Sequence, residues 1–364
     1  MSVFMLIFTI ALFFGVAGTP LVRKVAIKSG FIAIPKADRL HKQPTALMGG
    51  LAIYTAAVSG MLIMLVVSSL AGNAFRLSEF FSIVIAASLM AAIGLWDDRR
   101  PLPPWAKLGA QIVPVVMVYL VGVQVQLGFF SYPTLNIIAN FVMTIGWILY
   151  ITNAVNYFDN ADGTAIMTSA TASAIFLLIA ILNGQALVSV LAAAVLGASL
   201  GFARYNLPLP NSTIFMGDSG SLFLGFLLAV LGIKIRIPGN FNDITWMVPV
   251  IILGLPIFDT AMVFVSRTRR GISFFRGGVD HTTHRMARLG MDKLSVALAV
   301  SLITGALGLI AIFITRATRF EAYTVFVSLV GLALYVLWFI ELRQPLEFRS
   351  GQEPLQPVPD QLPK

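Results

Sequence analysis

Long apolar runs limit this chain to a narrow class of folds. Each run approaches the length of about 20 residues with which a helix spans a bilayer. Of the 364 residues, 58% are hydrophobic and 11% are charged, whereas about a quarter of the residues in a soluble domain are charged. Because backbone groups in lipid must bond to one another, such runs form helices, and no part of the chain requires a strand. The sequence therefore predicts an all-α, polytopic integral membrane protein.

Eleven apolar runs are predicted to cross the membrane, so the two termini should lie on opposite sides. We take residues 1–343 as one membrane-embedded domain and the Pro- and Gln-rich residues 344–364 as a disordered cytoplasmic tail. The first positive charges follow the first run, so we expect no cleavable signal peptide. The predicted transmembrane helices cover roughly residues 1–19, 47–70, 80–96, 107–122, 137–155, 165–182, 186–203, 219–235, 245–266, 294–315 and 322–341.

Basic residues indicate which side of the membrane each connection faces. Alternate connections, together with the tail, hold 20 of the 25 Lys and Arg residues. By the positive-inside rule these connections are cytoplasmic, which places the N-terminus outside and the C-terminus inside. The formal charge of +9 follows from this topology, so we expect no nucleic-acid partner. The five basic residues on the other side are Arg76, Lys234, Arg236, Arg316 and Arg319.

The same alternation gathers most of the candidate chemistry on the cytoplasmic face. The chain has no cysteine, which excludes disulfides, thiolate nucleophiles and Cys-ligated metals. Because the topology was derived from apolar runs and basic residues alone, the convergence of acidic residues and histidines on one face indicates a functional site there. These residues are Asp97, Asp98, Asp159, Asp162, Asp218, Asp280, His41, His281 and His284.

The stretch ITNAVNYFDNADGTA, residues 151–165, carries the densest group of polar side chains between two apolar runs. In a helix, Asn153, Asn156 and Asn160 would share one face, and so would Asp159 and Asp162. Gly163 would then allow the backbone to turn. Unpartnered amides and carboxylates at a membrane surface are costly, so the stretch is either part of the site or a polar loop with capping side chains.

Two further motifs carry carboxylates that suit a magnesium ion. Asp97 and Asp98 end the third run, where the helix dipole disfavours them unless Arg99 and Arg100 compensate. Carboxylate oxygens are ligands that Mg²⁺ prefers beside substrate phosphates. Asp218 opens the eighth run in the sequence MGDSGS. Either Asp218 or Ser219 is a helix cap, or Asp218 is a metal ligand at a helix start that offers N–H groups to phosphate.

Three other features admit both a functional and a structural interpretation. The loop at residues 267–288 holds two histidines three residues apart, which suits a diphosphate or a sugar better than zinc, or it is only a basic cytoplasmic loop. The loop at residues 31–50 offers Lys42 and His41 to an anionic substrate, or is simply a connection. Asp259 lies inside the ninth run, where it is functional or pairs with a neighbouring helix.

Taken in order, these blocks resemble those of the polyprenyl-phosphate N-acetylhexosamine-1-phosphate transferases. This family includes the phospho-N-acetylmuramoyl-pentapeptide translocase and the enzymes that load N-acetylglucosamine-1-phosphate onto undecaprenyl phosphate. Three features depart from the family pattern: Ala33 and Asn160 replace an aspartate and a glycine, and the histidine loop lacks the triple histidine of the pentapeptide branch. The matching blocks, from Pro35 to Arg288, are PKADRLHKQPTALMGG, WDDRR, NAVNYFDNADG, RYN with IFMGDSGS, and DHTTHR.

The resemblance implies a reaction as well as a fold. N-acetylglucosamine-1-phosphate would pass from UDP-N-acetylglucosamine to undecaprenyl phosphate with release of UMP. This is the first lipid-linked step of a cell-envelope polysaccharide such as lipopolysaccharide or teichoic acid. The enzyme would be a Mg²⁺-dependent glycosyltransferase, with Mn²⁺ as a substitute. It would lie in the bacterial cytoplasmic membrane with its active site on the cytoplasmic face.

The resemblance also implies roles for individual residues. The catalytic carboxylates would be Asp97, Asp98, Asp159 and Asp218. The metal ligands would be Asp218 together with Asp97 and Asp98. Uridine would be held by Asp162 and Asn206, with Phe215 stacked on it. The other substrate-binding residues would be Lys42, Asn153, Asn156, His281, His284 and Arg285.

Alternatives remain open at this point. Within the family, the donor is either UDP-N-acetylglucosamine or another UDP-N-acetylhexosamine, including the muramoyl-pentapeptide form. Outside it, a membrane transporter would place its carboxylates at mid-membrane, and only Asp259 qualifies. The sequence leaves a homodimer open, and it does not separate a one-step transfer from one with a covalent intermediate.

Overall fold

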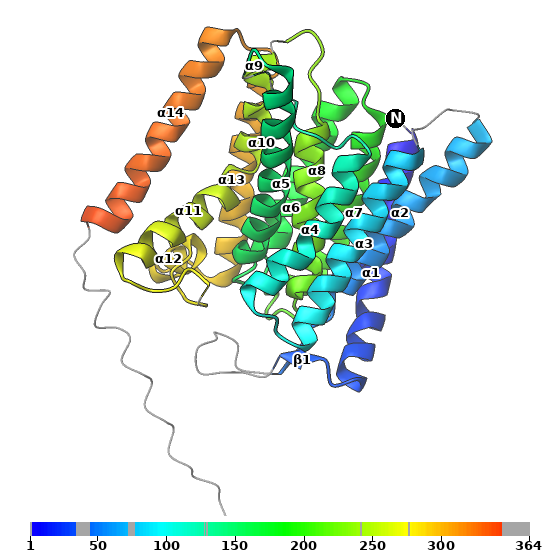
Figure 1. Cartoon of the computed structure of the whole chain (residues 1–364). Coiled ribbons are helices and arrows are strands. Elements are labelled where there is room, and N and C mark those ends of the chain that lie inside the picture. Colours follow the sequence, from blue (N-terminus) through cyan, green and yellow to red (C-terminus); the bar gives the residue numbers. More distant parts are fainter. Residues whose placement is uncertain are drawn as a thin grey trace, which may run out of the picture.

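A computed structural model describes residues 2–33, 44–71, 77–126, 128, 130–240, 242–275 and 277–343, which form a bundle of long helices (Figure 1). The predicted tail at residues 344–364 and the candidate ligands His41 and Lys42 lie outside these residues. The helices are α1 Ser2–Lys28, α2 Gly49–Ala71, α3 Leu77–Arg99, α4 Pro104–Leu120, α5 Pro133–Phe158, α6 Thr164–Leu182, α7 Ala186–Asn206, α8 Gly217–Lys234, α9 Asn242–Thr245, α10 Met247–Ile252, α11 Gly254–Arg269, α12 Thr282–Arg288, α13 Lys293–Ile314 and α14 Arg319–Trp338, followed by a π-helix at Phe339–Arg343.

The helical class and the multi-pass membrane character are confirmed. Eight of the described helices are long and apolar enough to cross a bilayer, and the apolar parts of α2 and α4 are shorter. The count of eleven crossings and the orientation of the termini stay predictions.

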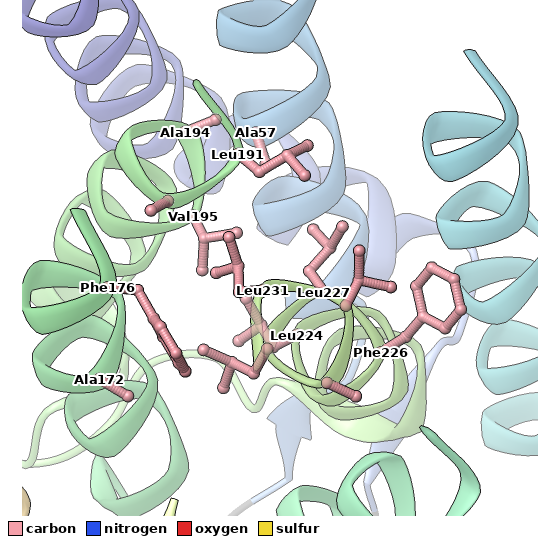
Figure 2. Close-up of a cluster of buried hydrophobic side chains, with 14 of the residues drawn as sticks. Ala57, Ala172, Phe176, Leu191, Ala194, Val195, Leu224, Phe226, Leu227 and Leu231 are labelled. Carbon is pink, nitrogen blue, oxygen red and sulfur yellow. The ribbon is translucent and has the colours of Figure 1, made fainter. Parts of the chain in front are cut away.

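Helix α8 is the centre of the bundle. Every residue from 219 to 233 is buried, and α3 and α5 are the helices that pack most closely against it. In Figure 2, Leu224, Leu227 and Leu231 of α8 lie beside Phe176 of α6 and Val195 of α7. A helix that is buried on all sides by apolar contacts is a core segment. This packing fixes the position of α8, including its N-terminal end.

Close backbone contacts bring together the helices that carry the polar sequence blocks. Gly94 of α3 lies so near α8 that a Cβ atom there would meet the backbone of Asp218. Gly225 of α8 similarly approaches the backbone of Thr152 on α5. Such contacts let membrane helices approach to van der Waals distance, so the ends of α3, α5 and α8 are held side by side.

Two predictions about regular structure were wrong. The ninth apolar run, expected as one span over residues 245–266, is broken at Trp246 and Leu253 into α9, α10 and α11. Pro249 and Pro256 lie in this stretch, and proline removes a backbone donor and interrupts a helix. A short antiparallel hairpin, β1 Ile32–Ala33 with β2 Thr45–Ala46, also forms before α2, although no strand was expected.

Helix α14 lies at the edge of the bundle (Figure 1). Ala322 is its one buried residue among those described. Phe326 makes an edge-to-face contact with Trp246, with ring centroids 5.1 Å apart. The large exposed apolar side chains of α14 are therefore suited to contact lipid.

We expect Gly94→Ala to lower the apparent melting temperature of the detergent-solubilised protein. The added methyl group would push α3 away from the start of α8. The control is Gly146→Ala in α5, where a Cβ atom meets nothing within 4 Å. That change should leave stability unchanged or raise it by about 0.5 to 1 kcal/mol. Equal melting temperatures for the two variants would contradict the close contact.

Candidate active site

Polar side chains from four helices converge where α3 and α5 end and where α4 and α8 begin. Asp97 and Asp98 occupy the last turn of α3, and Asn156 occupies the last turn of α5. Lys107 lies in the first turns of α4, and Asp218 lies in the first turn of α8. Three blocks that are far apart in the sequence thus meet at one end of the bundle.

The ammonium group of Lys107 holds two of the carboxylates together. Its Nζ lies 2.9 Å from Oδ2 of Asp97 and 2.6 Å from Oδ2 of Asp218. The amide oxygen of Asn156 lies 3.3 Å from the same Nζ. The Lys107 side chain is only 14% exposed, so these charges are weakly screened and strongly coupled.

Asp98 plays a different part, because it caps the start of α8 from another helix. Its Oδ1 accepts from the backbone N–H of Asp218 at 2.8 Å, and its Oδ2 accepts from that of Ser219 at 3.1 Å. A carboxylate at this position also suits the positive end of the helix dipole. Neither Asp218 nor Ser219 is the N-cap that the structural interpretation expected, since α8 begins at Gly217 and Met216 precedes it.

The asparagines of α5 do not share one environment. Asn156 donates from Nδ2 to Oδ1 of Asp218 and to the hydroxyl of Ser221, both at 2.8 Å. Asn153 instead pairs with the buried Gln111 of α4, to which it donates at 2.7 Å. Because α5 ends at Phe158, Asn160 lies beyond the helix and does not continue their face. Asn156 thus belongs to the charged cluster, whereas Asn153 joins α5 to α4.

The loop after α5 brings a further carboxylate to the cluster. Asp159 is half-buried and makes no hydrogen bond or ion pair with any described residue through its carboxyl group. Desolvation raises its pKa well above the usual value, and the negative charges of Asp218, Asp98 and Asp162 add to this effect. Asp159 is therefore the carboxylate of the cluster that retains its hydrogen-bonding capacity for a ligand.

Neighbouring side chains fix the shape of this loop. Gly163 adopts the left-handed conformation expected of it, with φ of 81°. Asn206 accepts from the Gly163 N–H at 3.1 Å and donates to the carbonyl of Ile214 at 3.0 Å. Asp162 forms an ion pair with Lys293 at 2.9 Å. Asn206 and Asp162, both predicted to hold uridine, therefore have structural partners here.

Phe215 lies in the segment that leads into α8, and it is half-buried. Its backbone N–H donates to Ala46 and its carbonyl accepts from Gly49, at 2.8 and 3.0 Å. The neighbouring Met216 carbonyl accepts from Gly50 at 2.7 Å. The start of α2 is thereby fixed beside the start of α8, although the stacking role of Phe215 stays a prediction.

The carboxylates offer ligands of the type that Mg²⁺ prefers, but they do not form a ready-made cage. The described residues contain no group of three or more His, Asp or Glu side chains placed to hold a metal ion. Asp98 is turned to the backbone of α8. Asp97 and Asp218, by contrast, already point one oxygen each at the same cation, the Lys107 ammonium. This pair therefore fits a hard divalent cation.

The histidine loop is built on a separate network of charges. Arg267 binds Asp280 through two hydrogen bonds, at 2.9 and 2.8 Å, and Arg270 adds a third at 2.5 Å. Burial by itself raises the pKa of Asp280, but the hydrogen bonds and charges of the two arginines outweigh it and hold the pKa well below the usual value. Asp280 is thus a fixed anion that shapes the loop.

Both histidines of this loop are buried. His281 precedes α12, and its Nδ1 lies 2.8 Å from a carboxylate oxygen of Asp259. The sequence left Asp259 either with a functional role or paired with a neighbouring helix. Its partner is instead His281, the residue that precedes α12. His284 is 8% exposed, and its Nδ1 has no hydrogen-bond partner among the described residues. Burial, reinforced by the charges of His281 and Arg288, lowers the pKa of His284 to about 4.

The histidine loop is attached to its surroundings on two sides. The Thr283 hydroxyl donates to the side-chain oxygen of Asn160, which ties α12 to the loop of Asp159. Arg285, predicted to bind substrate, forms an ion pair with Glu341 in the π-helix that follows α14. The histidine loop and the carboxylate cluster are thereby neighbours.

Sequence reasoning missed Lys107 and Glu341. Lys107 was counted only as one of the cytoplasmic basic residues, although its place just after the Asp97-Asp98 pair was a usable signal. Glu341 stands alone in a long apolar stretch near the end of α14. A lone carboxylate there requires a partner, but no sequence rule identifies that partner as Arg285.

Comparison with known proteins decides the family. A sequence model described as Glycosyl transferase family 4 matches residues 80–236. The chain is 30% identical over 308 residues to the probable undecaprenyl-phosphate N-acetylglucosaminyl 1-phosphate transferase of Bacillus subtilis, covering 82% of each chain. The chain belongs to the polyprenyl-phosphate N-acetylhexosamine-1-phosphate transferase family. It is accordingly an enzyme, a phosphotransferase embedded in the membrane.

Two further relatives are similar over most of this transferase. The decaprenyl-phosphate N-acetylglucosaminephosphotransferase of Mycolicibacterium smegmatis is 29% identical over 78% of this chain and 75% of its own. The undecaprenyl-phosphate alpha-N-acetylglucosaminyl 1-phosphate transferase of Yersinia pestis is 24% identical over 87% of this chain and 84% of its own. The similarity of all three extends well beyond the region matched by the family model, residues 80–236.

We expect Lys107→Met to destabilise the transferase by about 3 kcal/mol, because it leaves Asp97 and Asp218 facing each other without a cation. Mg²⁺ should restore part of this loss by taking the place of the ammonium. Thermal unfolding in detergent, with Mg²⁺ or with a chelator, measures both effects. Lys293→Met is the control, because the Lys293 side chain is 49% exposed and its ion pair should contribute less than about 1 kcal/mol. Equal losses of stability in the two variants would contradict the stabilising role of Lys107 between the two carboxylates.

Because of His284, the stability of the folded protein should depend on pH between about 4 and 6.5. The folded protein keeps this ring neutral down to about pH 4, whereas the ring of an unfolded chain takes up a proton near pH 6.5. Lowering the pH from 6.5 to 4 should therefore remove up to about 3 kcal/mol of stability. The His284→Gln variant lacks this term, so its apparent melting temperature should fall less over the same pH range. Parallel curves for the variant and the wild type would contradict the burial of a neutral ring.

Proposed function

We propose that this transferase moves N-acetylglucosamine-1-phosphate from UDP-N-acetylglucosamine to undecaprenyl phosphate and releases UMP. The donor and acceptor are taken from the names of the relatives in Bacillus subtilis and Yersinia pestis. The observation that carries the proposal is the Lys107 ammonium between Asp97 and Asp218, with the carboxyl group of Asp159, which has no partner among the described residues, beside them. A cation held among carboxylates suits a reaction between two phosphate groups.

The proposed chemistry is a phosphoryl substitution. An oxygen of the lipid phosphate forms a bond to the β-phosphorus of the nucleotide sugar. The bond from that phosphorus to the bridging oxygen breaks, and UMP leaves with the electron pair. A lipid monophosphate is already largely ionised at neutral pH, so the reaction does not require a general base. Positioning and charge neutralisation then supply most of the catalysis.

In this proposal Asp97 and Asp218 hold Mg²⁺, for which Mn²⁺ can substitute, and Asp98 keeps the start of α8 in place. The bound metal would neutralise the diphosphate of the donor. Lys107 moves its ammonium from the two carboxylates to a phosphate oxygen, so the positive charge stays within the site. Asp159 supplies the further carboxylate, and Asn156 orients Asp218 through its hydrogen bond.

The histidine loop is proposed to hold the sugar-phosphate end of the donor. His281, His284 and Arg285 offer several donors and acceptors to phosphate or sugar oxygens. The loop lacks a triple histidine, which favours UDP-N-acetylglucosamine over the muramoyl-pentapeptide donor. Residues 162, 206 and 215 remain the proposed uridine side of the site.

The membrane placement is part of the proposal. The chain would lie in the bacterial cytoplasmic membrane with eleven crossings, its N-terminus outside and its active site facing the cytosol. The support is the distribution of basic residues and the gathering of the carboxylates at one end of the bundle. The product would start a cell-envelope polysaccharide, and a homodimer is compatible with the exposed apolar surface of α14.

The test is UMP release by the purified protein with undecaprenyl phosphate, Mg²⁺ and single UDP-sugars. We expect turnover with UDP-N-acetylglucosamine and little with the muramoyl-pentapeptide donor. Asp218→Asn should lower turnover about 100-fold or more. Asp292→Asn, which changes an exposed capping carboxylate of α13, should leave it intact.

Faster UMP release with the muramoyl-pentapeptide donor would overturn the choice of donor. Absence of UMP release with every donor would overturn the proposed reaction. Normal turnover in Asp218→Asn would move the reaction away from the carboxylate cluster.

A further inference from the structure

Asp259 is a fully buried carboxylate whose two oxygens both bind residues at the start of α12, within the histidine loop. It lies in α11 and is 0% exposed. Its Oδ2 lies 2.8 Å from Nδ1 of His281, and its Oδ1 accepts from the backbone N–H of Thr282 at 2.6 Å. The described residues provide no other ion-pair partner for Asp259. One carboxylate thus fixes both the imidazole ring and the first turn of α12.

This pairing determines where the protons of His281 lie. A carboxylate accepts hydrogen bonds, so the Nδ1 that faces it must carry a proton. The other ring nitrogen, Nε2, makes no hydrogen bond with any residue that the structure describes. Since the bond at one ring nitrogen sets the state of the other, Nε2 is the atom of His281 that remains for a ligand.

The position of the ring connects it with the carboxylate cluster. Thr283 binds Asn160, which belongs to the same loop as Asp159. The rings of His281 and His284 lie close together, with centroids 5.8 Å apart, and His284 has a buried Nδ1 with no partner among the described residues. Two histidines with unused ring nitrogens therefore lie together beside the reactive loop.

We propose that Asp259 is a positioning residue that holds His281 with Nδ1 protonated and presents its Nε2 to the sugar-phosphate part of the donor. The inference rests on the proposed function for the identity of the donor. The state of the ring in the free protein does not depend on it. Asp259 itself does not touch the substrate, because it acts through His281.

A purely structural role for this pair makes a different prediction. Removing one partner of a buried ion pair is destabilising wherever it lies. Glu79 provides the comparison, because it is another buried carboxylate, 3% exposed, and it pairs with Lys234. This pair joins the start of α3 to the end of α8, at the opposite ends of those helices from Asp97 and Asp218. Glu79→Gln should therefore lower stability without changing the chemistry of the site.

The first measurement is made on the free protein by ¹⁵N NMR with labelled histidine. The chain has only three histidines, His41, His281 and His284, so single substitutions assign the signals. We expect His281 to keep a proton on Nδ1 at neutral pH. In Asp259→Asn, the side-chain oxygen can remain on the Thr282 N–H, which turns the NH₂ group toward His281. Nδ1 should then lose its proton, and Nε2 should carry one.

The second measurement is turnover with UDP-N-acetylglucosamine and undecaprenyl phosphate. Asp259→Asn should lower kcat about 10- to 100-fold, as changes in the partners that orient histidine ligands do, with a smaller change in KM. His281→Gln should lose at least as much. Glu79→Gln should melt at a lower temperature than the wild type and keep its kcat.

The possible outcomes distinguish a failure of the positioning role of Asp259 from a failure of the proposed function. An unprotonated Nδ1 in wild-type His281 would overturn the positioning role, and so would an unchanged kcat in a folded Asp259→Asn variant. If Asp259→Asn does not fold, the wild-type NMR spectrum and the turnover of His281→Gln decide, and full turnover in His281→Gln would sink the proposal. A wild-type protein that releases no UMP would instead overturn the proposed function, while the NMR result would stand.

Discussion

The Lys107 ammonium between Asp97 and Asp218 is the interaction on which the arrangement of the site depends. Two carboxylates brought this close repel each other unless a cation lies between them. The three side chains come from α4, α3 and α8, so their attraction acts across three helices. In the proposed reaction, the same pair of carboxylates would accept a divalent cation when a phosphate draws the ammonium away.

The packing of the rest of the bundle fixes the positions of the side chains in this charge cluster. The buried α8 is surrounded by apolar side chains, and Asp98 bonds its first free N–H groups. A helix whose end is fixed in this way presents Asp218 at a defined position. The histidine loop uses a similar device, because the buried Asp259 fixes the start of α12. In both places a carboxylate from one helix anchors the beginning of another.

Much of this architecture follows from the sequence, because apolar length and charge distribution act locally. The helical class, the turn at Gly163 and the membership of the family were all predictable. The break of the ninth run was not predicted, although Pro249 and Pro256 gave a local signal for it. The partners of Asp259 and Arg285 depend on tertiary packing, so no local pattern identifies them. Lys107 was hidden because a basic residue near a membrane surface is usually explained by topology alone.

The central claim is that Asp97, Lys107 and Asp218 act as one unit in phosphoryl transfer. A double-mutant cycle on kcat tests it most directly, with Asp97→Asn, Lys107→Met and the double variant compared under saturating substrates. Residues that act as a unit are strongly non-additive, so the double variant should lose about as much turnover as the worse single variant. Losses that multiply would show independent contributions and would contradict the account.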